Sequence, residues 1–185
     1  MTDQPATPSQ PARYTLPAIL FHWTSFALVV FVGVLGLLFG SIPRPNRLFW
    51  INIHAVVGLA VLALAMARVF WRLRSPPPAY PEGVSAITRR LSQPVHLLLY
   101  ALMIMLPIVG IVAFVWHARV FDFGLFKLDF GVPSTKPVYE AAEELHEMLA
   151  YSLFGLAGLH GLAALWHHFV QKDGILQRMW PFGKA

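Results

Sequence analysis

The stretch HEMLAYSLFGLAGLHGLAALWHH, residues 146–168, carries the strongest prediction of the fold. It contains one acidic residue, is otherwise almost wholly apolar, and has histidines at both ends and in its interior. About 20 mostly apolar residues in a helix are enough to cross a bilayer. Ionisable side chains are costly inside a membrane, so histidines there indicate a functional site. The stretch therefore predicts a membrane helix that carries chemistry.

Four mostly apolar runs of this kind occur, at residues 16–40, 51–71, 95–116 and 148–170. The chain has 185 residues, of which 57% are hydrophobic and 12% charged, against about 25% charged in soluble domains. Only short connections remain between the runs. We expect an all-α fold, an integral membrane four-helix bundle with up-down topology. It forms one domain over residues 15–180, after a disordered cytoplasmic tail at residues 1–14.

Basic residues are divided unequally between the two sides of this predicted bundle. One side holds Arg13, Arg68, Arg72, Arg74, Arg89, Arg90, Lys172, Arg178 and Lys184. The positive-inside rule puts that side, with both termini, in the cytoplasm. The net charge of +5 follows these membrane flanks, so no nucleic-acid partner is expected. The other side holds Arg44, Arg47, Arg119, Lys127 and Lys136.

Cysteine is absent, which excludes disulfides, cysteine-ligated zinc, iron–sulfur clusters and covalently attached haem. Any metal chemistry must then depend on histidine. His146 and His160 are fourteen residues apart on the fourth run. In a helix this spacing leaves them about 40° apart on one face and ~21 Å apart along the axis.

The predicted depths pair these two histidines with histidines of other helices. His54 shares the outer level with His146, and His22 shares the cytoplasmic level with His160. Two facing imidazoles fit one haem iron and fill both axial positions, so we expect two haems and one-electron transfer. The alternatives are hydrogen bonds between helices and a proton relay. Zinc fits less well, because it needs three or four converging ligands.

Further residues fit the haem interpretation by spacing. Arg68 follows His54 by fourteen residues, which suits either a propionate partner or a snorkelling cation. Gly36 follows His22 by fourteen, which suits either room for a macrocycle or close helix packing.

Other histidines lie near the cytoplasmic level. His167 lies seven residues past His160, and His96 enters at that level from the third helix, so both are candidates for a quinone site. His168 is expected to face elsewhere, and His117 is expected to be a solvated helix end.

These residues together resemble the bacterial cytochrome b561 family over nearly the whole chain after Tyr14. The resemblance rests on Phe21, His22, Trp23, His54, Gly58, Arg68, His96, Tyr100, Pro107, Gly110, His146, His160, His167, His168, and the tail from Asp173 to Arg178 and Met179.

The resemblance implies two b-type haems with His22, His54, His146 and His160 as axial ligands. It also implies a bacterial inner (cytoplasmic) membrane location and exchange of electrons with ubiquinone. Some similar members are superoxide oxidases, which implies an oxidoreductase that takes electrons from superoxide at the outer face. The outer basic residues would then steer the anion, although acidic residues of the third connection oppose this.

Two alternatives stay open for the function. A haem-bearing anchor would be a pure electron carrier for a partner oxidoreductase. Its docking surface would be the phenylalanine-rich stretch at residues 120–132 or the arginine-rich connection between the second and third helices. The phenylalanine-rich stretch also suits simple packing at the membrane interface or substrate access. A histidine-based proton or metal-ion transporter is the alternative of another class.

Overall fold

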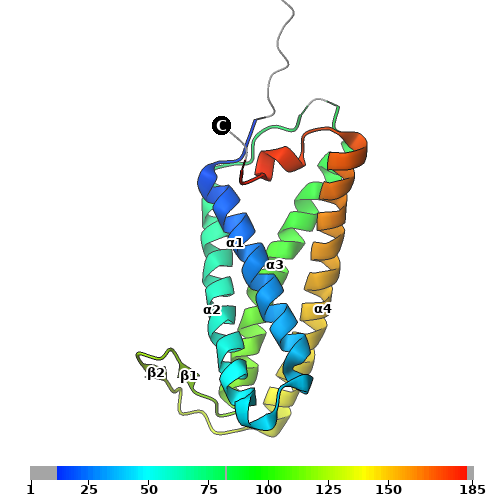
Figure 1. The fold of residues 1–185 in the computed structure, drawn as a ribbon. Helices are drawn as coiled ribbons and strands as arrows, with labels where there is room; N and C mark the ends of the chain where they lie inside the picture. The colour runs from blue at the N-terminus through cyan, green and yellow to red at the C-terminus, as the bar shows by residue number, and fades with distance from the viewer. Residues whose placement is uncertain (1–11, 82, 183–185) are drawn as a thin grey trace, which may run out of the picture.

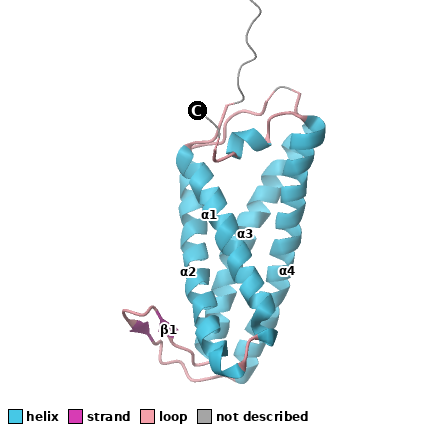
Figure 2. Ribbon diagram, viewed as in Figure 1, coloured by secondary structure: helices cyan, strands magenta, loops and turns pink. Residues whose placement is uncertain are grey.

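The structure is a computed structural model that describes residues 12–81 and 83–182. Four long helices run up and down beside one another (Figures 1 and 2). Their bounds are Leu16–Leu38 for α1, Arg44–Arg74 for α2, Ala86–Trp116 for α3 and Lys136–Trp166 for α4. Shorter pieces are η1 (Phe39–Ser41), η2 (His167–Gln171) and η3 (Leu176–Met179).

The two ends of the bundle are built differently. An antiparallel hairpin of β1 (Phe121–Asp122) and β2 (Lys127–Leu128) lies at one end, which we call the hairpin end. The first and last described residues lie together at the other, which we call the termini end (Figure 1). Of the predicted tail, residues 1–11 lie outside the described part of the chain.

The helices extend beyond the apolar runs that predicted them. The second begins at Arg44 instead of near Trp50, and the third begins at Ala86 instead of near Pro94, so Pro94 and Pro107 both lie inside α3. A polar cap explains the start of α3, since the Ser85 side chain accepts the Thr88 backbone N–H at 3.2 Å. Helix α2 has no side-chain cap and instead carries Pro45 in its first turn, where a missing N–H is tolerated. At 1.5 Å per residue, a helix of 31 residues is about 46 Å long and projects past an apolar layer of roughly 30 Å.

All four helices are long and apolar enough to cross a membrane. Many large apolar side chains are exposed on their outer faces, as expected where the surrounding solvent is lipid. The predicted all-α, four-helix membrane bundle with up-down topology is therefore confirmed. Its central core consists of Val61, Ala65, Leu102, Met103 and Leu153.

Packing in the bundle leaves room between particular helices. Helix α3 packs along α4, α1 along α2, and α2 along α3, while α1 and α4 approach each other less often. The close approach of α1 and α4 comes at Gly33, where a Cβ would lie 1.8 Å from Cζ of Phe154. The ring of Phe154 thus occupies the place of a missing side chain, between the two histidine levels of α4.

The termini end is closed by Arg178, whose side chain is only 3% exposed. Its guanidinium donates to the carbonyl oxygens of Ala12 and Pro78 and stacks on the rings of Tyr14 and Tyr80. One cation therefore joins the start of the chain, the proline-rich connection between α2 and α3, and the C-terminal tail.

The hairpin end is closed by a two-bond clamp. Asn52 of α2 donates to the Asp122 carbonyl at 2.8 Å, and the Asp122 backbone N–H donates to the Asn52 side chain at 2.9 Å. Beside it Phe121 is 2% exposed and packs on Phe114 with ring centres 4.3 Å apart. Leu125 at the hairpin tip is 97% exposed. The phenylalanine-rich stretch therefore has one face on the bundle and one face outside it.

Candidate functional site

Four of the eight histidines face one another in two pairs, one at each end of the bundle. At the hairpin end, the ring centres of His54 and His146 are 6.0 Å apart. At the termini end, those of His22 and His160 are 6.3 Å apart. The structure thus brings together the same partners that depth along the helices predicted.

Both separations suit two imidazoles on one metal. Metal–imidazole bonds are about 2 Å long and the bonding nitrogen lies roughly 1 Å from its ring centre, so an imidazole–iron–imidazole unit separates ring centres by about 6 Å. Two rings that only pack against each other have no preference for a separation of about 6 Å. The geometry of both pairs therefore fits a bis-histidine haem.

Two cavities flank the hairpin-end pair, with volumes of about 350 and 390 Å³. One lies toward the hairpin and the other toward the middle of the bundle. They meet along a shared wall of Phe39, His54, Gly58, Pro107 and His146. Space on both sides of two facing imidazoles is the shape that a flat macrocycle requires.

The imidazole nitrogens at the hairpin end are also arranged for a ligand. His146 donates Nδ1–H to the Leu106 carbonyl at 3.0 Å, which leaves Nε2 for a metal, as in most metal-binding histidines. Nδ1 of His54 is buried without a hydrogen bond of ordinary geometry among the described residues, although the His54 ring interacts with the backbone of Val32. The ring is therefore held less firmly than that of His146.

Missing side chains make room for these two rings. At Gly110 of α3 a Cβ would lie 2.9 Å from Cε1 of His146, closer than real Cβ contacts. At Gly36 of α1 a Cβ would lie 3.5 Å from Cε1 of His54, an ordinary contact. Gly36 thus lies beside the histidine pair that its spacing predicted. Gly110 is the position where a larger residue would collide with a histidine ring.

The termini-end pair is more crowded. His160 also faces His96 of α3, with ring centres 5.2 Å apart, and His96 donates Nδ1–H to the Ser92 carbonyl at 2.5 Å. His96 is a candidate for the quinone site, and the structure places it against a predicted haem ligand. Two histidines, His22 and His96, are therefore within reach of the same partner ring.

Arg68 contacts a histidine directly. Its guanidinium donates to Nδ1 of His22 at 2.9 Å, and its charge lies 5.2 Å from the centre of the Tyr100 ring. An Nδ1 that accepts a hydrogen bond places the proton of neutral His22 on Nε2, where it blocks metal binding. The Arg68 contact and iron coordination through Nε2 therefore exclude each other, and a bound haem requires Arg68 to turn elsewhere.

A small cavity of about 30 Å³ lies next to this cluster and is lined by Arg68, Arg72, His96 and Tyr100, among others. Two guanidinium groups at one cavity suit an anionic group such as a propionate. This cavity therefore supports the prediction that Arg68 pairs with a propionate.

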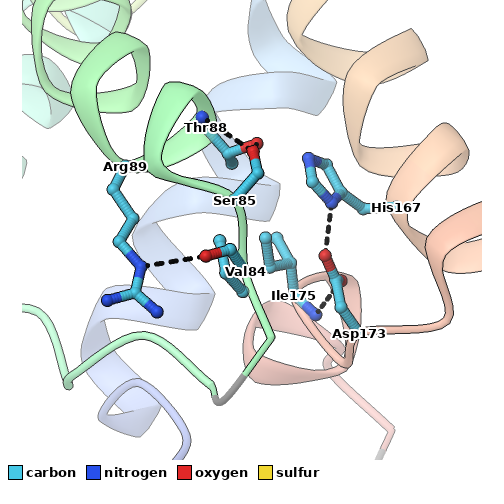
Figure 3. A network of polar contacts seen from close by, with 7 residues as sticks. All are labelled: Val84, Ser85, Thr88, Arg89, His167, Asp173 and Ile175. Atoms are coloured by element: carbon cyan, nitrogen blue, oxygen red, sulfur yellow. Dashed lines mark hydrogen bonds and ion pairs between the residues drawn. The ribbon is translucent and has the colours of Figure 1, made fainter.

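His167 and His168 lie at the end of α4 and have different partners. His167 donates Nδ1–H to Asp173 at 2.5 Å, and both side chains are nearly buried (Figure 3). His168 contacts the Gln177 side chain at 3.2 Å. The different surroundings agree with the expectation that the two side chains face different ways.

Three of the five basic residues of the hairpin end lie close to carboxylates. Arg119 lies 3.8 Å from Glu143, Lys127 lies 3.1 Å from Asp122, and Lys136 lies 3.5 Å from Glu140. These pairs reduce the expected steering of an anion. Arg119 differs from the other two cations, because it lines the cavity beside His146.

His117 follows the last residue of α3 and caps the end of the helix, as predicted, but it is not simply solvated. Its ring packs on Tyr139 with centres 4.1 Å apart, and its Nδ1 lies 3.6 Å from the Glu143 carboxylate. Burial and the neighbouring Arg119 lower the pKa of His117, and Glu143 opposes this only in part. His117 is therefore neutral near pH 7, and Arg119 is the cation that pairs with Glu143.

Comparison with known proteins agrees with this geometry. Residues 13–182 match the family model described as prokaryotic cytochrome b561. The chain is 31% identical over 174 residues to "Cytochrome b561 homolog 2" of Escherichia coli, covering 91% of this chain and 92% of that protein. It is 33% identical over 175 residues to "Probable superoxide oxidase CybB" of Yersinia pestis, covering 91% and 96%. It is 27% identical over 180 residues to "Cytochrome b562" of Cereibacter sphaeroides, covering 92% and 97%.

The family match spans all four membrane helices and every histidine described above. Family membership implies binding of haem b, for which the histidine pairs have suitable geometry. It also favours electron transfer over the transporter alternative. The chain therefore belongs to the prokaryotic cytochrome b561 family, and it is a multi-pass bacterial membrane protein of electron transport.

Proposed function

We propose that this protein carries two b-type haems and moves electrons from superoxide at the hairpin end to ubiquinone at the termini end. The proposal places it in the bacterial inner membrane with both termini in the cytoplasm. The observation that carries it is the presence of two histidine pairs, at opposite ends of one bundle, with nearly equal ring separations of 6.0 and 6.3 Å. The unequal division of basic residues supports the orientation.

His54 and His146 would hold one haem, and His22 and His160 the other. When bound, haem supplies one-electron transfer between the two ends of the bundle. With two histidines holding each haem, neither site would leave a position at which oxygen could bind. The protein's part is to fix the rings, exclude water with the apolar helices and admit reactants only at the ends.

Superoxide as the electron donor is supported by the relative whose name is "Probable superoxide oxidase CybB". The hairpin end supplies Arg119 at a cavity that reaches the His54 and His146 rings. A cation at this place attracts a small anion, although Glu143 reduces the effect.

Ubiquinone as the electron acceptor is supported by His167, a nearly buried polar side chain at the termini end. A quinone needs a hydrogen-bonding group of this kind where it accepts electrons and protons. The net reaction oxidises two superoxide ions to two molecules of oxygen while one ubiquinone takes two electrons and two protons to become ubiquinol.

The test is superoxide-dependent formation of ubiquinol by the purified, haem-loaded protein in vesicles that contain ubiquinone. We expect ubiquinol to form at half the rate of superoxide loss, and added superoxide dismutase to abolish it. If superoxide neither reduces the haem nor drives ubiquinol formation, the superoxide assignment is wrong.

Reduction of the haem by ubiquinol without any response to superoxide would favour the electron-carrying anchor. The exposed tip of the hairpin, with Leu125, Phe126 and Phe130 outward, would then be the surface to test against a partner oxidoreductase.

A further inference from the structure

The end of α4 holds a buried histidine–carboxylate pair (Figure 3). Oδ2 of Asp173 lies 2.5 Å from Nδ1 of His167, and the side chains are 10% and 15% exposed. Oδ1 of the same carboxylate accepts the Ile175 backbone N–H at 3.1 Å. Both carboxylate oxygens are therefore used, one for the histidine and one for the turn of the tail.

The backbone takes an unusual route to make this pair. Helix α4 ends in a five-residue π-helical turn, His167–Gln171, and Lys172 then adopts a left-handed conformation with φ of 53°. Turns of π-helix are rare in proteins, and those that occur are often at functional sites. A lysine in the left-handed region has a strained backbone. The chain reverses at this point and brings Asp173 back onto the helix that it has just left.

Among the described residues, the other histidine near a carboxylate is His117, which lies 3.6 Å from Glu143 in a more exposed place. Burying a carboxylate is costly unless a proton donor partners it. The turn of the tail alone does not require an acid, because a single acceptor oxygen satisfies the Ile175 N–H. The second oxygen of Asp173 thus serves the histidine.

The carboxylate fixes which nitrogen of His167 faces a ligand. With Nδ1–H held by Asp173, Nε2 is the atom left to accept or donate a proton. In Figure 3 the ring edge away from Asp173 is turned toward the start of α3, where Ser85 and Thr88 lie. Their hydroxyl groups are 2.9 Å apart and add polar groups to that region.

We propose that Asp173 is a positioning residue that holds His167 with Nδ1 protonated, so that Nε2 gives a proton to a quinone carbonyl oxygen. This inference rests on the proposed reduction of quinone at the termini end. As the quinone oxygen gains an electron supplied by reduced b-type haem, the Nε2–H bond of the His167 imidazolium breaks and an O–H bond forms. His167 is left neutral with Nδ1–H still on Asp173, and a proton taken up from the aqueous phase restores Nε2–H. A second electron and a second proton then complete the quinol. Asp173 stays a carboxylate throughout.

The variant Asp173→Asn distinguishes the positioning of the His167 proton from the role of Asp173 in holding the turn of the tail. An asparagine keeps one acceptor oxygen, which can retain the Ile175 N–H bond and therefore the turn. Its amide then faces His167 with an N–H donor, which requires the histidine proton to move from Nδ1 to Nε2. The variant thus preserves the fold while reversing the tautomer of neutral His167.

The experiment measures quinone reduction and the tautomer in the same haem-loaded protein. For Asp173→Asn we expect kcat to fall about 10- to 100-fold, as is typical when the partner of a functional histidine is removed. KM for ubiquinone should change less than about twofold, and ¹⁵N spectra should show Nδ1 of His167 losing its proton. Asp173→Glu should restore part of kcat. His168→Gln, next to His167 but bonded to Gln177, is the matched control and should keep the wild-type kcat.

The outcomes distinguish this inference from the proposed function. If His167→Gln removes quinone reduction while Asp173→Asn leaves kcat unchanged, the role of Asp173 is wrong and the quinone site stands. If His167→Gln also leaves quinone reduction unchanged, the quinone does not bind there. Should Asp173→Asn fail to fold, partial kcat with a protonated Nδ1 in Asp173→Glu would support the inference, and full loss of kcat with Nδ1 still protonated would contradict it.

Discussion

At the hairpin end the histidine pair stands between two large cavities, whereas at the termini end the corresponding pair is crowded by charged and aromatic side chains. His54 and His146 have no competing histidine, and their surroundings are mostly apolar. His160 has two histidine neighbours, His22 and His96, and Arg68 contacts His22. Two pairs with nearly equal ring separations therefore lie in different environments. The hairpin-end site already has space on both sides of its histidines for a macrocycle. At the termini-end site, Arg68 would have to move away from His22 before a haem could bind.

The largest expected effect concerns the choice of partner for His160. We expect His22→Ala to lose one of two haems, because the His22 and His160 rings have the separation of a bis-histidine pair. His96→Ala should keep both haems, since its ring is too close to His160 to leave room for a metal between them. Haem counted per purified chain is the measurement. Loss of a haem in His96→Ala with none lost in His22→Ala would reverse the pairing.

The next effect concerns how the two ends are closed. Arg178→Ala removes hydrogen bonds from a buried cation to two carbonyls and contacts with two tyrosine rings, so we expect a loss of about 2 to 4 kcal/mol in the free energy of unfolding. Asn52→Ala removes two neutral hydrogen bonds at the hairpin end, for which about 1 to 2 kcal/mol is expected. Unfolding of each variant in detergent gives both values. An equal or larger loss for Asn52→Ala would mean that Arg178 does not hold the termini end together.

Gly110 and Gly36 give a matched pair within the hairpin end. Gly110→Ala should displace the His146 ring and destabilise that haem site by about 1 to 3 kcal/mol, the usual cost of overpacking. Gly36→Ala adds a methyl group at an ordinary contact distance from His54, so it should bind both haems as the wild type does. Competition for haem by an apo-haemoprotein measures the difference. Similar retention of haem in the two variants would show that the His146 ring moves freely.

The smallest effect is the pH response of the hairpin end. Because the pKa of His117 is lowered in the folded protein, the unfolded chain binds its proton more readily, and the contribution of this residue to stability decreases as pH falls below about 6.5. We expect faster hydrogen exchange in the connection between α3 and α4 at pH 5.5 than at pH 7, after correction for the intrinsic rate. His117→Gln should remove that difference. A difference of the same size in the variant would assign the response to another group.

Much of this architecture could be predicted from the sequence, because helices have a regular rise and apolar length has a fixed relation to the bilayer. Fourteen-residue spacing was enough to place His146 and His160 at two levels of one helix. The same spacing separates His96 from Gly110 and would have drawn attention to Gly110. The depth of a residue along its helix axis can therefore be predicted from sequence spacing alone.

Side-chain partners were harder to predict, since they depend on the rotation of each helix and on the paths of loops. The contact of His96 with His160 could not be predicted from the depth of His96 alone. Asp173 reaches His167 only because the tail reverses after a π-helical turn. Arg178 was named as a cytoplasmic cation and as part of the family resemblance, but its role in closing an end of the bundle depends on segments distant in sequence that meet there.

The two histidine levels are tested most directly by the reduced-minus-oxidised visible spectrum of the purified protein, with haem counted per chain. The proposal predicts two b-type haems in the wild type and one in His54→Ala, with the remaining spectrum that of the termini-end site. A single haem in the wild type, or two in His54→Ala, would contradict it.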